Sequence, residues 1–286
     1  SDPGPVLLAF DARADEQTAR VQGVQRQIQL RRGEGPFLFD PVGKRYLDFV
    51  SGFSAVSQGH CHPRIVKAIQ EQAERLTLLS RVLYSDQFGP FAEYCTKLFG
   101  YDRVLTMNTG AEAFETALKI ARKFGGRGRH VVVSAYGSFH GRTLAALAAT
   151  GQPAKHEPFH PMPDGFRHVA FDDIEALEGA VDPSVSAVLL ETVQGEGGVV
   201  PASVEYLQAV RRLCDERKLL LIVDEIQTGF ARTGEWFGFQ HAGVVPDVVT
   251  MAKAMGNGVP VGAVWATREI ASVMKPGDHG DQKSVV

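Results

Sequence analysis

Short apolar runs alternate with helical stretches from about residue 100 onward, and this alternation constrains the fold more than any other feature. The runs are nearly continuous in Val, Leu, Ile and Ala, unlike a strand with one face in water. Five of them are HVVVSAY, SAVLLE, LLLIVDE, DVVTMA and GAVWAT. Strands of this kind, separated by helices such as the one expected over 203–217, predict an α/β fold. The sheet should be mainly parallel and covered on both faces.

A further strand, RVLTMN, precedes the clearest helix of the sequence. The strand ends in a turn at Thr109 and Gly110, and the helix is expected over Ala111–Phe124. Small and apolar side chains recur on one side of this segment at helical spacing. That spacing predicts that the helix packs one face on the sheet.

The first part of the chain has a different pattern. Residues 1–45 are expected to be extended and are rich in arginine, and FLFDPVGKRYLDF predicts a hairpin that turns over Pro41–Gly43. An amphipathic helix is expected over 62–77. Pro63 begins it, because the first turn of a helix does not need the missing N–H group.

Composition excludes several classes of protein. The formal net charge of -3 and the lack of a basic run exclude a nucleic-acid partner. The apolar runs have the length of strands, so no membrane span is expected. The three cysteines lack CxxC spacing, which fits a reducing compartment. We expect a cytoplasmic location, or the mitochondrial matrix if a transit peptide has been removed.

Two residues at the ends of neighbouring apolar runs indicate a particular chemistry. Asp224 closes LLLIVDE, and Lys253 comes just after DVVTMA. Ligands of open α/β sheets bind beyond the carboxyl ends of the strands, so these two residues and Glu191 are expected at one crevice. A lysine amine can form a Schiff base with pyridoxal 5'-phosphate, and a carboxylate can keep its pyridine nitrogen protonated. The pair therefore predicts a pyridoxal-phosphate enzyme with Lys253 and Asp224 as catalytic residues.

Other residues near the same strand ends could complete such a site. Gly110 and Ala111 open a helix, where free backbone N–H groups suit a phosphate monoester. Phe139 and His140 could offer an aromatic face to a heteroaromatic ring. Arg142 could clamp a substrate carboxylate with two hydrogen bonds.

Metal and nicotinamide sites are not expected. His60, Cys61 and His62 are adjacent, so their side chains point to opposite sides of an extended chain, and no second cluster completes a tetrahedral site. A turn before the helix at Pro63 explains them better. The glycines around residues 126–128 and 195–197 do not form a GxGxxG strand-to-helix turn.

Five motifs together resemble the class III, or ω-amino-acid, aminotransferases of pyridoxal-phosphate fold type I. They are MNTGAEAFETALKIARKF, SFHGRT, ETVQGEGGV, VDEIQTGFARTG and AKAMGNGVPVGAV, and the resemblance runs from Phe37 to His279. Within the class, SAVSQGHCHP, LTLLSRVLYSD, YCTKLFGYDRVLTMNTG and VMKPGDHG are most similar to ornithine δ-aminotransferases. FHGRTLAALAATGQP is more similar to acetylornithine aminotransferases.

The resemblance implies a role for each matching residue. Lys253 would be the Schiff-base lysine, Asp224 the partner of the pyridine nitrogen, and Gln227 a neighbour of the phenolic oxygen. Glu196 resembles a carboxylate that pairs with an arginine in one half-reaction and releases it in the other. The implied cofactor-binding set is Gly110, Ala111, Phe139, His140, Glu191, Asp224, Ile226, Gln227 and Lys253, and the implied substrate-binding set is Arg142, Glu196 and Phe53.

The implied reaction moves the δ-amino group of ornithine to a 2-oxo acid such as 2-oxoglutarate. Phe53 stands where ornithine aminotransferases have a tyrosine that helps to bind ornithine. One lost hydrogen bond of this kind is worth about 1 kcal/mol, so acetylornithine or another ω-amine remains an alternative donor. A fold-type-I decarboxylase is disfavoured because Ala252, not histidine, precedes Lys253.

The resemblance also implies a domain organisation. Residues 1–45 would belong to the small domain, 46–275 would form the cofactor-binding large domain, and 276–286 would be a divergent tail. A segment like HGSTFGGNP is expected in the family where DQKSVV stands here. We therefore expect either a truncated chain without the C-terminal small domain or one part of a longer protein. A catalytically impaired fragment that binds the cofactor or a full-length partner is therefore a further hypothesis. The family implies a homodimer with its sites at the subunit interface.

Overall fold

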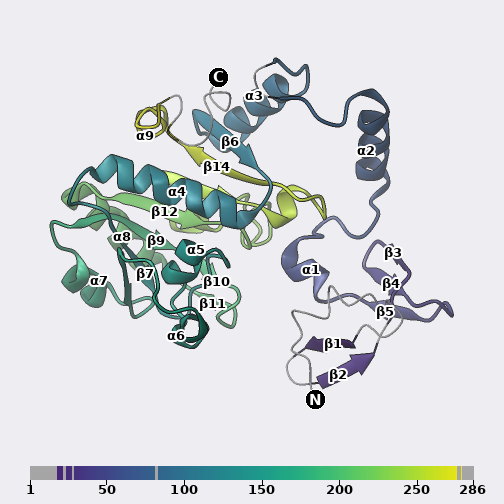
Figure 1. Cartoon of the computed structure of the whole chain (residues 1–286), viewed down its shortest axis with the longest axis horizontal. Coiled ribbons are helices and arrows are strands. Elements are labelled where there is room, and N and C mark those ends of the chain that lie inside the picture. Colours follow the sequence, from purple (N-terminus) through teal and green to yellow (C-terminus); the bar gives the residue numbers. More distant parts are fainter. Residues whose placement is uncertain (1–17, 22–23, 28, 81–82, 276–277, 279–286) are drawn as a thin grey trace. The chain divides into compact units, whose positions relative to one another are not determined.

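The computed structural model describes residues 18–21, 24–27, 29–80, 83–275 and 278, and the chain forms two compact units (Figure 1). One unit contains the chain up to Gly52 together with Gln58–Thr77, and the other contains Phe53–Ser57 and the chain from Leu78 onward. The short helix α1 (Ser51–Ser54) leads from the first unit into the second. Of the predicted tail over 276–286, only Asp278 is among the described residues.

The first unit is built from antiparallel strands and one helix. Strands β1 (Thr18–Val21) and β2 (Val24–Gln27) pair with each other, and β3 (Arg32–Glu34), β4 (Phe37–Phe39) and β5 (Arg45–Leu47) form a three-stranded sheet. The helix is α2 (Pro63–Arg75), which confirms the prediction over 62–77. The predicted hairpin is β4–β5. Its turn is closed by Asp40, whose Oδ1 accepts the N–H groups of Val42 at 3.1 Å and Lys44 at 2.8 Å.

The second unit contains a seven-stranded sheet in the order β6-β14-β13-β12-β9-β7-β8. Its strands are β6 (Arg103–Met107), β7 (Val131–Ala135), β8 (Phe166–Val169), β9 (Val185–Leu190), β12 (Leu220–Asp224), β13 (Val248–Met251) and β14 (Gly262–Ala266). β14 pairs antiparallel with both of its neighbours, while the other six strands share one direction. The mainly parallel sheet and the six predicted strands are confirmed. The edge strand β8 was not predicted, because its sequence FRHV lacks a continuous apolar run.

Helices connect these strands. They are α3 (Phe88–Phe99), α4 (Gly110–Gly125), α5 (Leu144–Ala149), α6 (Pro153–His156), α7 (Ile174–Ala180), α8 (Val204–Arg217) and α9 (Arg268–Ala271). Helices α4 and α8 confirm the helices predicted over 111–124 and 203–217. Single 3₁₀ turns occur at η3 (Glu157–Phe159), η4 (Gly238–Ala242) and η5 (Lys253–Met255), and β10 (Val193–Gln194) pairs with β11 (Val200–Pro201).

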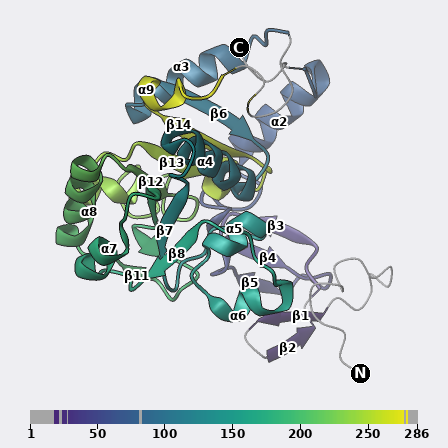
Figure 2. The same cartoon turned by 60° about the vertical axis from the view of Figure 1, so that its left-hand side comes forward.

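The sheet is buried on both faces, as its uninterrupted apolar strands predict. Successive strand residues belong to different cores: Ile222 packs with α4 on one face, and Val223 packs with α8 on the other. Figure 1 shows α4 lying across the sheet, and Figure 2 shows α7 and α8 together on the other side. Each fully buried Val, Leu or Ile contributes about 1.5–3 kcal/mol, so the two cores hold the strand ends in fixed positions.

A buried carboxyl group lies just after β12 and ties a distant turn to the sheet. Glu225 is fully buried, accepts the N–H of Phe239 in η4 at 3.1 Å, and is hydrogen-bonded to the hydroxyl of Thr228. Burial raises the pKa of Glu225 to about 7. The folded protein therefore keeps a proton on this group over a pH range in which the unfolded chain releases it.

We expect this group to make the protein less stable as the pH rises from about 4.5 to 7, because protons bound only by the folded state are lost. In Glu225→Gln, the fall in unfolding free energy over this range should be smaller by about 3 kcal/mol. Urea unfolding at a series of pH values measures the unfolding free energy of each protein. Glu235→Gln, a change at an exposed position of the same unit, is the control. Equal pH slopes in the wild type and Glu225→Gln would contradict the assignment.

Candidate active site

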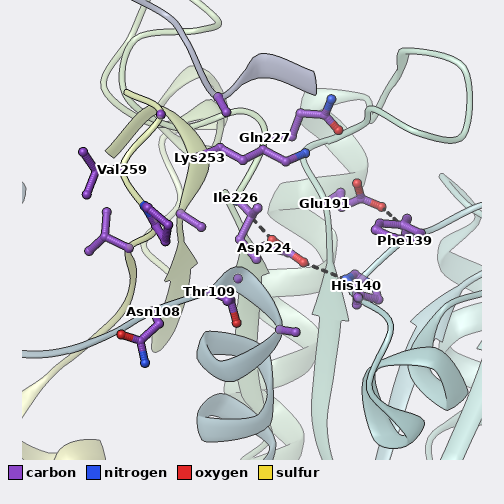
Figure 3. A pocket seen from close by; sticks show the side chains of 18 residues that line it. Asn108, Thr109, Phe139, His140, Glu191, Asp224, Ile226, Gln227, Lys253 and Val259 are labelled. Carbon is purple, nitrogen blue, oxygen red and sulfur yellow. Dashed lines mark hydrogen bonds and ion pairs between the residues drawn. The ribbon is translucent and has the colours of Figure 1, made fainter. Parts of the chain in front are cut away.

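A cavity of about 380 Å³ opens where the parallel strands of the sheet end (Figure 3). Loops that follow β6, β7, β9, β12 and β13 meet there, because strands of one direction end at the same edge. All nine residues of the predicted cofactor-binding set line it: Gly110, Ala111, Phe139, His140, Glu191, Asp224, Ile226, Gln227 and Lys253. The structure thus brings together residues from five separate segments, while their roles remain predictions.

Lys253 enters this cavity from the loop after β13. Its backbone has φ +48°, in the left-handed region that non-glycine residues rarely adopt, at a strain cost of about 1 kcal/mol or more. In Figure 3, the amine end of Lys253 points toward Gln227 and Glu191. Burial lowers the pKa of the Lys253 amine, although the charges of Asp224 and Glu191 act in the opposite direction. A larger share of the amine is therefore neutral and nucleophilic near neutral pH.

Asp224 forms a buried pair with His140. Its Oδ2 lies 2.8 Å from Nδ1 of His140, and its Oδ1 accepts the N–H of Ile226 at 3.1 Å. A carboxylate only accepts hydrogen bonds, so His140 donates from Nδ1. The imidazole stacks on Phe114 with ring centroids 5.7 Å apart, which fixes its orientation. Both side chains are buried, so this hydrogen bond is stronger than it would be in water.

The amino end of α4 forms another wall of the cavity. Thr109 and Glu112 make a capping box, in which Glu112 N–H donates to the Thr109 hydroxyl at 3.1 Å and Thr109 N–H donates to Glu112 at 3.0 Å. This leaves the N–H groups of Gly110 and Ala111 without an acceptor among the described residues. A Cβ on Gly110 would lie 2.8 Å from Cδ1 of Ile226. The wall is therefore shaped for a close approach by an anion.

Glu191 links two of the loops around the cavity. Its Oε2 accepts the N–H of Phe139 at 3.0 Å and so holds the loop after β7 against the loop after β9. Burial, partly opposed by His140, raises the pKa of Glu191 to about 7. This side chain can therefore hold a proton at neutral pH, next to the charged carboxylate of Asp224.

The three predicted substrate-binding residues do not line the cavity. Arg142 is exposed, and its Cζ lies 5.7 Å from the ring centroid of Phe139. Glu196 lies in the turn between β10 and β11. Phe53 is 73 % exposed. Arg142 thus lies beside the Phe139 ring, and Glu196 lies on a neighbouring turn. Phe53 is not among the residues that line the cavity.

Several lining residues were not predicted. The largest set is Gly258, Val259, Pro260 and Val261, after Lys253, and the others are Ala55, Asn108, Gly141 and Ala252. Ser54 also contributes, since its hydroxyl accepts a hydrogen bond from Gln227 Nε2 at 3.4 Å. The stretch GNGVPVG could have predicted the set after Lys253, because its glycines and proline mark a loop directly beyond that lysine.

Two other observations concern metal and membrane. In the part of the chain that the structure describes, no group of three His, Cys, Asp or Glu residues is arranged to hold a metal ion. His60 instead pairs with Asp48, with 2.7 Å between Nε2 and Oδ2. Among the same residues, no helix combines the length and apolar character required to span a membrane.

The three cysteines are unpaired in the structure. Cys95 and Cys214 are buried, and Cys61 is exposed.

Comparison with known proteins places the chain among aminotransferases, both by sequence and by structure. Residues 18–282 match the family described as aminotransferase class-III. The chain is 48% identical to an acetylornithine aminotransferase of Gloeobacter violaceus and 47% identical to a mitochondrial ornithine aminotransferase of Drosophila ananassae, over 88% of its own length in each case. It spans only 64% and 60% of those proteins. A solved ornithine aminotransferase of Toxoplasma gondii, with partial occupancy of PLP at its active site, superposes with a TM-score of 0.86 at 40% identity, covering 92% of this chain and 64% of that one.

Proposed function

Because this chain belongs to the class-III aminotransferase family, we propose that it binds pyridoxal 5'-phosphate in the cavity at the strand ends and takes part in transamination. The observation that carries the proposal is the buried Asp224–His140 pair in the same cavity as the Lys253 amine. The Asp224 carboxylate can stabilise a positive charge on a ring nitrogen, and the Lys253 amine can attach to an aldehyde carbon.

The residues present fit this cofactor. The unpaired amides of Gly110 and Ala111 suit its phosphate, and the lack of a side chain on Gly110 keeps that wall open. Ile226 and Phe139 give the cavity apolar surfaces for a flat ring. Asp224 supplies the carboxylate that a protonated pyridine nitrogen requires. We propose that Gln227 lies near the phenolic oxygen of the ring.

When bound, pyridoxal phosphate acts as an electron sink that makes a C–H bond of the amino substrate acidic. Lys253 then removes a proton from the substrate carbon, and its pKa, lowered by burial, leaves the amine free to do so near neutral pH. Asp224 would hold the proton on the ring nitrogen, and the hydrogen bond from His140 keeps this carboxylate oriented. Glu191 fixes the Phe139 loop at the side of the cavity.

For the substrates, we propose that ornithine is the donor, through its δ-amino group, and that a 2-oxo acid such as 2-oxoglutarate is the acceptor. Four sequence motifs shared with ornithine aminotransferases support this choice. N-acetylornithine is the second candidate, because acetylornithine aminotransferases are as similar to the chain as ornithine aminotransferases are. We propose Arg142 as the group that binds a substrate carboxylate. Family membership also supports a homodimer.

An absorption spectrum tests the proposal. After addition of pyridoxal phosphate and removal of the excess, we expect a band near the edge of the visible range that borohydride abolishes. Ornithine, N-acetylornithine and 4-aminobutyrate are then added separately, and ornithine should change the band fastest. Absence of the band would overturn the cofactor assignment. A band that no donor changes would favour a fragment that binds the cofactor without turnover.

A further inference from the structure

The short helix α1 is a left-handed turn. All four of its residues have positive φ angles, between +49° and +70°, although Ser51, Phe53 and Ser54 are not glycine. In this region the Cβ atom of an L-residue lies too close to the following carbonyl oxygen, so consecutive residues rarely adopt it. Strain of this kind persists only where the surrounding structure holds it, and it is concentrated at functional sites. The turn is therefore a candidate functional element.

Side chains hold the left-handed turn at both of its ends. Before it, Oδ1 of Asp48 accepts the N–H of Ser51 at 2.9 Å. After it, Nη2 of Arg232 donates to the hydroxyl of Ser57 at 2.6 Å and lies 3.5 Å from the backbone oxygen of Ser54. These contacts fix the position of the Ser54 side chain.

The turn brings Ser54 to the edge of the cavity. Ala55, the next residue, is one of the lining residues. The Ser54 hydroxyl is partly buried and accepts a hydrogen bond from Nε2 of Gln227 at 3.4 Å. Gln227 itself lines the cavity, and in Figure 3 the amine end of Lys253 points toward it. Ser54 thus contacts a residue of the site from behind the wall.

The amide of Gln227 is held from two sides. A Cβ on Gly195 would lie 2.2 Å from Oε1 of Gln227, so the oxygen end rests against the backbone of Gly195. The nitrogen end carries two hydrogens, so Ser54 can hold one while the other is offered to an acceptor in the cavity. The last torsion of a glutamine side chain has broad energy minima, so without Ser54 the amide would sample several orientations.

Resting on the proposed function, we propose that Ser54 is a positioning residue, which orients the Gln227 amide toward the phenolic oxygen of pyridoxal phosphate. The left-handed turn delivers the hydroxyl to Gln227, and this is the use of its strain. An N–H group directed at the phenolic oxygen stabilises the negative charge there. The loaded site should therefore release the proton shared by this oxygen and the Lys253 nitrogen at a lower pH than it would without Ser54.

Ser54→Ala and Ser54→Gly form a matched pair of variants that tests the proposal. Both remove the hydroxyl, but glycine adopts φ +70° without strain, so Ser54→Gly should be the more stable protein in urea unfolding. The pH midpoint of the borohydride-sensitive band is then measured in each protein loaded with pyridoxal phosphate. We expect the proton affinity to rise about fivefold in both variants, the worth of one hydrogen bond.

Gln227→Met shows whether Ser54 acts through the amide. Methionine has a similar shape but no hydrogen-bond donor, so this variant should itself raise the proton affinity. Adding Ser54→Ala to Gln227→Met should cause no further rise, because residues that act through one contact are not additive. Ser272→Ala removes an exposed hydroxyl at the end of α9 and is the control, which should leave the pH midpoint unchanged.

The two proposals fail in different ways. A wild type without a borohydride-sensitive band would overturn the cofactor assignment and, with it, the role of Ser54. A wild type with the band, combined with the same pH midpoint in Ser54→Ala, would overturn the role of Ser54 alone. A shift that Ser54→Gly reverses would also overturn this role, because the change would then follow the strain and not the hydroxyl. A full further shift in the Gln227→Met background would show that Ser54 does not act through Gln227.

Discussion

Lys253→Ala is expected to lower the rate of transamination by about 10³-fold or more, because it removes both the covalent anchor of the cofactor and the proton-transferring amine. The borohydride-sensitive band should also disappear. Some pyridoxal phosphate should still bind, through the amides of Gly110 and Ala111 and the carboxylate of Asp224. Single-turnover kinetics with ornithine and the absorption spectrum are the two measurements.

Lys218→Ala is the matched control for this variant. Lys218 also has a left-handed backbone, with φ +53°, but it caps α8 and does not line the cavity. The control separates the loss of the amine from any effect of placing alanine at a strained position. If Lys253→Ala kept the band, or lost no more activity than Lys218→Ala, the assignment of Lys253 would be wrong.

Asp224→Asn is expected to lower the rate by about 10²-fold, because a neutral amide cannot stabilise a positive charge on the ring nitrogen as a carboxylate does. Asparagine has the same shape and keeps an acceptor oxygen for His140, so the protein should still fold. Removing the acceptor entirely, as in Asp224→Ala, would leave a buried imidazole N–H unpaired at a cost of about 1–3 kcal/mol.

The measurements for Asp224→Asn are the rates of both half-reactions and the unfolding free energy. Asp173→Asn is the control, because Asp173 caps α7 through its side chain and asparagine caps helices equally well. A loss of activity that is explained by a loss of stability, or a rate equal to that of the wild type, would argue against a direct role of Asp224 at the ring nitrogen.

Much of the fold could be predicted from hydrophobic periodicity. The central strands are apolar at every position because both faces are covered, and this pattern is visible in sequence. α4 was predicted within one residue at each end, since Thr109 and Glu112 form a capping box that is encoded locally. β8 was missed because Arg167 and His168 interrupt its apolar pattern. A strand at the edge of a sheet does not need to be apolar throughout.

Some residues of the candidate site could be predicted from the sequence, and others could not. Residues directly after strands were predicted at the cavity because the edge of a parallel sheet gathers them, whatever lies between them in sequence. The contact between Lys155 and Glu196 could not be predicted, because it joins residues 41 positions apart. It depends on a four-residue helix and a hairpin turn that carry no periodic signal. Phe53 was placed by resemblance alone, and the structure leaves it exposed.

β14, the one antiparallel strand of the seven-stranded sheet, has a consequence for the order in which the strands of this sheet can pair. β6 pairs with β14, so Met107 lies opposite Gly262, and in the described structure β6 joins the sheet through this strand alone. β6 therefore gains its strand partner in this sheet only after β14, a segment far along the chain, has been made. Contacts between such distant residues slow folding. We therefore expect β6 to join the sheet after the neighbouring parallel strands have paired.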